Sequence, residues 1–194
     1  MNKNINYLGV VKLPWKSFFD LLKSKSTFIE HQYDSKRKNF YMNRTKKELK
    51  IQKEIVKKYP MSTQLFYRYT NKKFKDLIPL KLWKKFSIDK NTARVQVMRH
   101  TPGTVSLPHV DRYNSFLTDI GKDKSIVKTI KIKRIWITMT DPKLGQALFV
   151  GNAVAYWLKK GTALTFNHRV YHAGCNTGIE DRYTLTITGW KNGQ

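Results

Sequence analysis

The clearest strand pattern lies near the C-terminus, where residues 183–188 read Tyr183-Thr184-Leu185-Thr186-Ile187-Thr188. Threonines alternate with Tyr183, Leu185 and Ile187, as in a β-strand with two different faces. Similar short runs occupy residues 93–98, 134–139, 147–150 and 163–166. Turn residues separate these runs, at 101–103, 141–142, 160–161 and 176–178. Short strands at this spacing predict a β-sandwich or barrel from residue 92 onward.

The first 91 residues show helical patterns instead. Pro14-Trp15-Lys16-Ser17 can open a short helix, and residues 44–59 place apolar side chains opposite a lysine-rich side. A third helical stretch over 75–86 is interrupted near Pro79. We therefore expect a helix-rich basic segment, residues 1–91, that packs on a β-rich core of residues 92–194. Within that core, residues 114–133 are expected to form a lysine-rich insertion that contributes little to the packing.

Composition limits the class of protein. The chain has 194 residues, of which 40% are hydrophobic, and a formal net charge of +25. A chain of this kind forms one globular domain with a core, which excludes a disordered polycation. The charge favours an acidic partner such as nucleic acid, but an AT-rich coding sequence also produces a lysine excess. Arginine, which grips phosphates and bases with two hydrogen bonds, is scarce, so nucleic acid is possible but not the favoured partner.

Cys175 is the only cysteine. It excludes an intrachain disulfide and zinc sites built from several thiolates, and it suits a reducing compartment. The N-terminus lacks a basic stretch followed by an apolar one, and no run approaches the roughly 18 apolar residues of a membrane helix. We expect a cytoplasmic protein without a membrane segment.

The segment His109-Val110-Asp111 places an imidazole and a carboxylate two residues apart. If the segment is extended, both side chains leave the same face of the strand. His172, far along the chain, can supply a third ligand from a neighbouring strand. Two histidines and one carboxylate form the facial triad that holds Fe(II) and leaves positions open for a co-substrate and O₂.

Arg182 follows His172 by ten residues, across a turn at Asn176-Thr177-Gly178. The two residues can therefore lie on adjacent antiparallel strands that face one cavity. Arg182 and Thr184 share a strand face, where a guanidinium and a hydroxyl can hold a carboxylate. A dicarboxylate that chelates iron at one end and meets Arg182 at the other satisfies both features, and 2-oxoglutarate is such a molecule.

As an ordered set these segments resemble the Fe(II)/2-oxoglutarate-dependent dioxygenases, most closely their prolyl 4-hydroxylase-like branch. Residues 101–111 look like its segment of Gly, five residues and His-x-Asp; residues 160–164 look like its Lys-Gly-Thr/Ser-Ala-Leu strand; and residues 171–175 look like its His-Ala-Gly-Cys segment. Trp157-x-x-x-Gly161 and His172-x-x-x-Asn176 are similar to the aspartyl/asparaginyl β-hydroxylases. The resemblance covers roughly residues 92–190. It departs at His100, where a tyrosine is usual, and at Gly145-Gln146, where Gly-Gly is usual.

The resemblance implies a double-stranded β-helix, which is a jelly-roll or cupin-like barrel, with N-terminal helices packed outside it. It implies Fe(II), O₂ and 2-oxoglutarate as a co-substrate. His109, Asp111 and His172 are then the metal-binding and catalytic residues. Arg182, Thr184 and Thr138 are then the residues that bind the co-substrate.

The reaction implied is hydroxylation of an unactivated C–H bond. A prolyl, aspartyl or asparaginyl side chain in a protein or peptide is the first expectation for the substrate, and a free amino acid or small metabolite is the second. A nucleic-acid oxygenase or demethylase is the third, since demethylases of alkylated bases usually carry a second arginine where Thr188 stands. A catalytically silent barrel that acts as a basic binding module is the non-enzymatic alternative.

Overall fold

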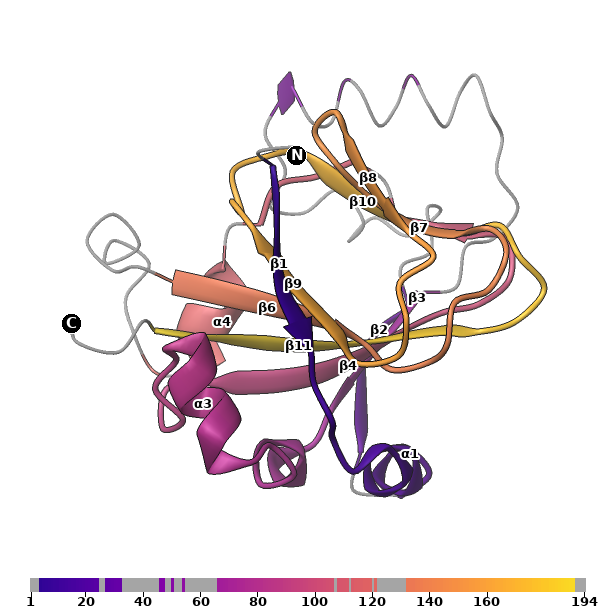
Figure 1. The fold of residues 1–194 in the computed structure, drawn as a ribbon. Helices are drawn as coiled ribbons and strands as arrows, with labels where there is room; N and C mark the ends of the chain where they lie inside the picture. Colours follow the sequence, from indigo (N-terminus) through magenta and orange to yellow (C-terminus); the bar gives the residue numbers. More distant parts are fainter. Residues whose placement is uncertain are drawn as a thin grey trace.

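The computed structural model describes residues 4–24, 27–32, 66–106, 108–111, 113–119, 121 and 132–190, together with 46, 47, 50 and 54. In these parts of the chain, eleven strands form two antiparallel sheets (Figure 1). The large sheet has the order β1 (Ile5–Val10), β9 (Thr162–Phe166), β6 (Ile132–Thr138), β11 (Arg182–Trp190), β4 (Arg94–His100), β3 (Phe66–Thr70) and β2 (Phe28–Gln32). The small sheet has the order β5 (Thr104–Val105), β10 (His172–Asn176), β7 (Gln146–Val150) and β8 (Ala153–Tyr156).

The strands from β4 to β11 have the connectivity of a jelly roll. Strands β4, β6, β9 and β11 lie in the large sheet, and β5, β7, β8 and β10 lie in the small one. The chain therefore changes sheet at every connection except the hairpin between β7 and β8. This arrangement places β11 between β4 and β6, and β10 between β5 and β7. It is the double-stranded β-helix found in cupins, and it confirms the predicted fold class.

Helices cover the outer face of the large sheet. This layer contains α1 (Trp15–Leu22), the 3₁₀ helix η2 (Lys72–Lys75) and α3 (Leu80–Phe86) (Figure 1). Phe18, Phe74 and Phe86, one from each helix, are fully buried in one cluster with Leu185 and Ile187 of β11. Burying a side chain of this size contributes about 2 kcal/mol of hydrophobic free energy. These contacts hold the N-terminal segment on the sheet.

Local sequence explains where α1 and α3 begin and where α3 ends. Pro14 and Pro79 directly precede the two helices, where a fixed φ and a missing N–H cost nothing. Helix α3 ends at Ser87, which adopts a left-handed conformation with φ of 52° and donates its N–H to the carbonyl of Lys84. Within the predicted helix over 75–86, only Leu80–Phe86 is α-helical; η2 ends at Lys75, and residues 76–79 separate it from α3.

The inner face of the large sheet looks toward the small sheet and carries a row of polar residues. Because side chains alternate along a strand, Leu185 and Ile187 face the helices while the even-numbered residues of β11 face the interior. Those interior residues are all buried: Arg182, Thr184, Thr186 and Thr188. A separate apolar cluster fills the rest of the space between the sheets: Met98, Trp136, Leu148, Val150, Ala155 and Leu164.

The N-terminal segment differs from the prediction by containing strands. Strands β1, β2 and β3 extend the large sheet at both edges. The run Phe66-Tyr67-Arg68-Tyr69-Thr70 of β3 consists mostly of aromatic and β-branched residues, so its strand signal was present in the sequence and was overlooked. The predicted helix over 44–59 lies almost entirely outside the described residues. Residues 114–119 form α4 (Asn114–Asp119), and Phe116 and Leu117 are fully buried, so the prediction of an insertion with little core was wrong there. No described helix has the length and hydropathy needed to cross a bilayer.

Candidate metal centre

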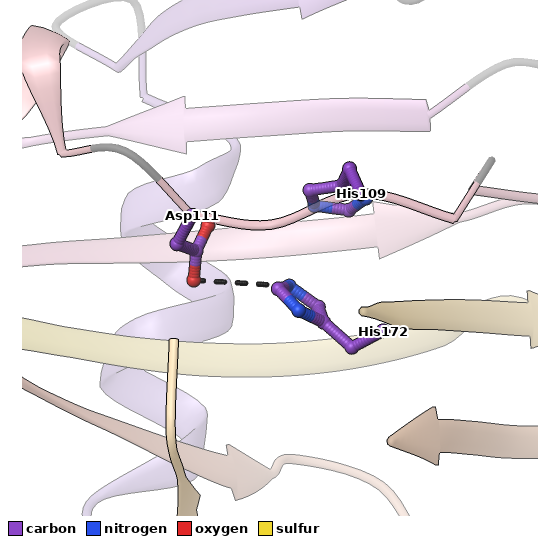
Figure 2. A group of neighbouring side chains, drawn as sticks. All are labelled: His109, Asp111 and His172. Atoms are coloured by element: carbon purple, nitrogen blue, oxygen red, sulfur yellow. Dashed lines mark ion pairs between the residues drawn. The ribbon is translucent and has the colours of Figure 1, made fainter. Parts of the chain in front are cut away.

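Three residues that the sequence analysis proposed as ligands meet between the two sheets. The nitrogen and oxygen atoms that His109, Asp111 and His172 can offer to a metal all lie within 4.8 Å of one another. Figure 2 shows the three side chains converging, two from one loop segment and one from the start of β10. His172 is 2% exposed, the side chain of Asp111 is 12% exposed, and His109 is half-buried. The three side chains therefore form a compact group.

Backbone hydrogen bonds position the triad. His172 donates its N–H to the carbonyl of His109 at 2.9 Å, and His109 donates its N–H to the carbonyl of His172 at 3.1 Å. Asp111 donates its N–H to the carbonyl of His168 at 3.0 Å. The segment is therefore not a regular strand as expected, since His109 and His172 form an isolated bridge. The bridge nevertheless keeps both side chains facing the same space.

The ring of His172 is oriented by its own neighbourhood. Its Nδ1 lies 3.1 Å from the carbonyl oxygen of Val170. A carbonyl only accepts hydrogen bonds, so Nδ1 carries the proton of the neutral ring and Nε2 carries the lone pair. Nε2 lies 3.7 Å from Oδ2 of Asp111, beyond hydrogen-bonding range. A histidine that donates one ring N–H to a backbone carbonyl and points the other nitrogen at a carboxylate is the usual setting of a metal ligand.

The carboxylate of Asp111 is ionised and its two oxygens differ. Burial raises its pKa, but Arg134, followed by His172, His109 and Arg68, outweighs burial and lowers the pKa to about 2. Oδ1 forms an ion pair with Nη1 of Arg134 at 2.6 Å. Oδ2 is buried and accepts no hydrogen bond from the described residues.

A divalent cation fits this donor set. A buried carboxylate oxygen without a hydrogen bond is costly, and a metal ion among the three side chains would satisfy it. Two imidazole nitrogens and one carboxylate oxygen suit first-row transition metals, and with open positions they suit Fe(II) in particular. The chemistry of these three side chains therefore supports a metal site.

Arg182 lies in the barrel interior at the start of β11. It is 6% exposed, and Nη1 donates to the carbonyl of Ala147 on β7, 3.0 Å away in the opposite sheet. No ion pair to a described acidic residue is present. Burial lowers its pKa to about 10, so the guanidinium remains charged at neutral pH. A buried cation in this setting stabilises an anion bound beside it.

Gly174 provides space beside the guanidinium. A Cβ at this position would lie 3.0 Å from Nη1 of Arg182 and 3.3 Å from Nε2 of His100. The interior around Arg182 is otherwise well filled, with a void of about 20 Å³ between it and residues such as Thr138 and Gln146. That volume holds roughly one water molecule. A larger ligand at this position requires neighbouring side chains to move.

The two predicted threonines differ in what their hydroxyls do. Oγ1 of Thr184 is buried and has no hydrogen-bond partner among the described residues, so it is available to a ligand. Oγ1 of Thr138 donates to the carbonyl of Lys159 at 2.6 Å and accepts from the N–H of Thr162 at 3.1 Å. Thr138 therefore ties β6 to the turn before β9. Its contact with a co-substrate stays a prediction.

The strands of His172 and Arg182 do not pair as expected. Strand β10 belongs to the small sheet and β11 to the large one, so the two residues come from opposite sheets of the barrel. The connection that leads from β10 to β11 is held in place by Asn176. Its Nδ2 donates to the carbonyl of Glu180 at 2.7 Å and to the carbonyl of His100 at 2.9 Å. Both side chains still reach the same interior, because the jelly roll places the two sheets face to face.

Sequence reasoning missed Arg134. It lies on β6 two residues before Trp136 and four before Thr138, so all three share the inner face of the strand. The available signal was a charged residue at a position that alternation along the strand places on the same face as Trp136. Its partner Asp111 is distant in sequence, and the pairing depends on the fold.

Comparisons with known proteins leave the family open. No protein-family model and no curated protein matches the chain. Among solved structures it is similar to a cupin-2 domain protein from Rhodospirillum rubrum, with 12% identity over 64% of this chain and 59% of that one and a TM-score of 0.38. It is similar to a predicted oxalate decarboxylase from Thermotoga maritima, with 13% identity over 64% and 80% and a TM-score of 0.38. It is also similar to a cupin 2 conserved barrel domain protein from Rhodopseudomonas palustris, with 8% identity over 65% and 61% and a TM-score of 0.39.

TM-scores below 0.5 add no weight, so the fold assignment rests on the strand order. Strand order and the triad together define a double-stranded β-helix domain with a candidate metal site.

Proposed function

We propose that the protein is a 2-oxoglutarate-dependent dioxygenase that uses Fe(II) and O₂ to hydroxylate an unactivated C–H bond. The observation that carries the proposal is the pairing of two features inside one barrel. One is the His109, Asp111 and His172 group with its ligand atoms within 4.8 Å. The other is Arg182, a buried charged group with no carboxylate partner in the described chain. A metal centre and an anion site together suit a chelating dicarboxylate.

The residues then have separate roles. His109, Asp111 and His172 hold the iron, which supplies the oxidising chemistry that protein side chains lack. Arg182 binds the distal carboxylate of 2-oxoglutarate and so orients the keto acid toward the metal. Thr184, whose buried hydroxyl has no hydrogen-bond partner in the described part of the chain, donates a further hydrogen bond to the same molecule.

For the substrate we propose a prolyl, aspartyl or asparaginyl side chain of a protein or peptide, on the basis of the family resemblance alone. A free amino acid or small metabolite is the alternative, followed by nucleic acid. We propose a cytoplasmic location, which the single cysteine supports.

The proposal is tested by binding and turnover together. Peptides, amino acids and nucleic acids are screened for substrate-stimulated release of succinate with Fe(II) and 2-oxoglutarate. Arg182→Ala should raise the dissociation constant of 2-oxoglutarate roughly 30-fold or more, as expected when one partner of a buried charge pair is removed. Arg182→Lys should restore part of the affinity, because it keeps the charge but loses the two-point geometry.

Arg169→Ala, at an exposed arginine, is the control and should bind 2-oxoglutarate like the wild type. Wild-type protein that binds metal but neither binds nor consumes 2-oxoglutarate would favour the silent binding module. An Arg182→Ala variant that binds 2-oxoglutarate as tightly as the wild type would place the anchor elsewhere.

A further inference from the structure

Arg134 contacts the metal-facing carboxylate directly, without belonging to the triad. Nη1 of Arg134 lies 2.6 Å from Oδ1 of Asp111, and both side chains are mostly buried, with 13% and 12% exposed. The other oxygen, Oδ2, faces His172. The two oxygens of one carboxylate are therefore divided between two neighbours.

The guanidinium is fixed on two further sides. Its Nε donates to Oγ1 of Thr188 on β11 at 2.9 Å. Its carbon Cζ lies over the ring of Tyr113, 4.9 Å from the ring centre, in the range of a cation–π contact. A planar group held from three directions has little freedom to leave Oδ1.

We propose that Arg134 is a positioning residue that holds Asp111 as a one-oxygen metal ligand and so keeps a coordination position open. This inference rests on the metal site in the proposed function. A carboxylate can bind a metal through one oxygen or both. With Oδ1 engaged by Arg134, only Oδ2 is available to the metal.

The number of open coordination positions on the metal explains why one-oxygen ligation by Asp111 is important for the proposed reaction. A six-coordinate ion with three single-atom protein ligands has three positions left. A keto acid that chelates through two atoms and one O₂ molecule occupy all three. A second oxygen from Asp111 would take one of them. The ion pair thus reserves room that the proposed chemistry requires.

Mn(II) is a suitable probe because it binds oxygen and nitrogen ligands and is paramagnetic. The experiment counts the exchangeable waters on bound Mn(II) by pulsed electron paramagnetic resonance in ¹⁷O-labelled water, without 2-oxoglutarate. The wild type should hold three waters. Arg134→Met should hold two, because Oδ1 is free to bind the metal. Its affinity for Mn(II) should be at least as high as that of the wild type, since a positive charge beside the ligand has been removed.

Two variants separate positioning from simple structural support. Arg134→Lys keeps a charged donor and should restore the third water. Arg99→Met removes a similar ion pair outside the barrel, in which Nη2 of Arg99 lies 2.8 Å from Oδ2 of Asp181 and Cζ lies 5.4 Å from the ring centre of Tyr67. It should keep three waters and wild-type affinity. An Arg134→Met variant with three waters, or one that loses Mn(II) affinity while Arg99→Met keeps it, would overturn the inference.

A measurement on the wild type keeps the inference testable if Arg134→Met does not fold. In metal-induced infrared difference spectra, one-oxygen ligation separates the two carboxylate stretching bands more widely than two-oxygen ligation does. Narrowly spaced bands from Asp111, identified by their loss in Asp111→Asn, would contradict the inference. A wild type that holds Mn(II) with three waters but does not bind 2-oxoglutarate would refute the proposed function and leave the role of Arg134 standing.

Discussion

The main chains of His109 and His172 are joined by two hydrogen bonds, of 2.9 and 3.1 Å. These bonds connect a loop to β10 and involve no side-chain atoms. The distance between the two imidazoles is therefore set by the backbone, and their ring centres lie 4.4 Å apart. Pre-organisation of this kind places ligands for a metal before the metal arrives.

His109→Ala should remove metal binding and leave the fold nearly unchanged. The bridge to His172 survives because it uses only backbone atoms, and the side chain is only half-buried. We expect the free energy of unfolding, measured with urea in the presence of a chelator, to change by about 1 kcal/mol or less. Mn(II) titration should show no binding at the triad.

His168→Ala is the matched control, because the ring of this half-buried histidine contacts that of Tyr113 beside the site but is not one of the three ligands. It should retain Mn(II) affinity. Equal metal affinity in His109→Ala and the wild type would remove His109 from the site.

Gly174→Ala should weaken co-substrate binding without affecting the metal. The added Cβ would lie 3.0 Å from Nη1 of Arg182, so the guanidinium must shift. A misplacement costing about 1 to 3 kcal/mol corresponds to a rise of roughly 5-fold to 150-fold in the dissociation constant of 2-oxoglutarate. Isothermal titration of the Mn(II) form measures it. The control is Ala173→Ser, on the other face of β10, which should bind 2-oxoglutarate like the wild type. Unchanged binding in Gly174→Ala would show that the co-substrate does not use this space.

His100 should make stability depend on pH. Burial, followed by the charges of Arg182 and His109, lowers its pKa well below the usual value of 6.5. Below about pH 6.5, His100 is therefore protonated in the unfolded chain but stays neutral in the folded protein. Folding stability must fall as pH decreases below about 6.5, by up to about 1.4 kcal/mol per pH unit from this group. His100→Gln should lose that contribution.

Urea unfolding of both proteins between about pH 5 and 7.5, in a chelator, measures the difference in slope. Parallel curves for the wild type and His100→Gln would contradict the assignment of a neutral, buried His100.

Nucleic acid should bind weakly and without sequence preference. Arg134 and Arg182 face the barrel interior and Arg99 is paired with Asp181, so lysines provide most of the described surface charge. Each phosphate contact adds about one unit to the slope of log affinity against log salt concentration. Affinity measured by fluorescence anisotropy should therefore vanish as salt rises. Tight, sequence-selective binding at high salt would instead favour a nucleic-acid substrate.

The fold was predictable to the extent that its strands carry a periodic pattern. Strands β4, β6, β7, β9 and β11 coincide with the five alternating runs. Strands β5 and β8, with two and four residues, were not predicted. Strand β10 reads His172-Ala173-Gly174-Cys175-Asn176, which has no β-branched residue, so the strand expected at His172 rested on the placement of a metal ligand and not on periodicity. Which sheet each strand joins depends on contacts across the barrel, and turn residues alone do not determine it.

The site was predictable where ligand spacing carries the signal. His109 and Asp111 are neighbours in sequence, and His172 belongs to a segment that resembles a known pattern. Arg134 was not predictable in the same way, because its interaction with Asp111 joins β6 to a distant loop. The dense packing around Arg182 was not predictable either, because it depends on side chains from strands that are distant in sequence.

The central claim is that one barrel holds Fe(II) and 2-oxoglutarate together. Anaerobic addition of Fe(II) and 2-oxoglutarate to the protein tests it most directly, because a keto acid chelated to Fe(II) gives a visible charge-transfer band. We predict this band in the wild type, its loss in His109→Ala, and a higher 2-oxoglutarate concentration for half-saturation in Arg182→Ala. A folded wild type that binds Fe(II) but shows no band at saturating 2-oxoglutarate would contradict the account.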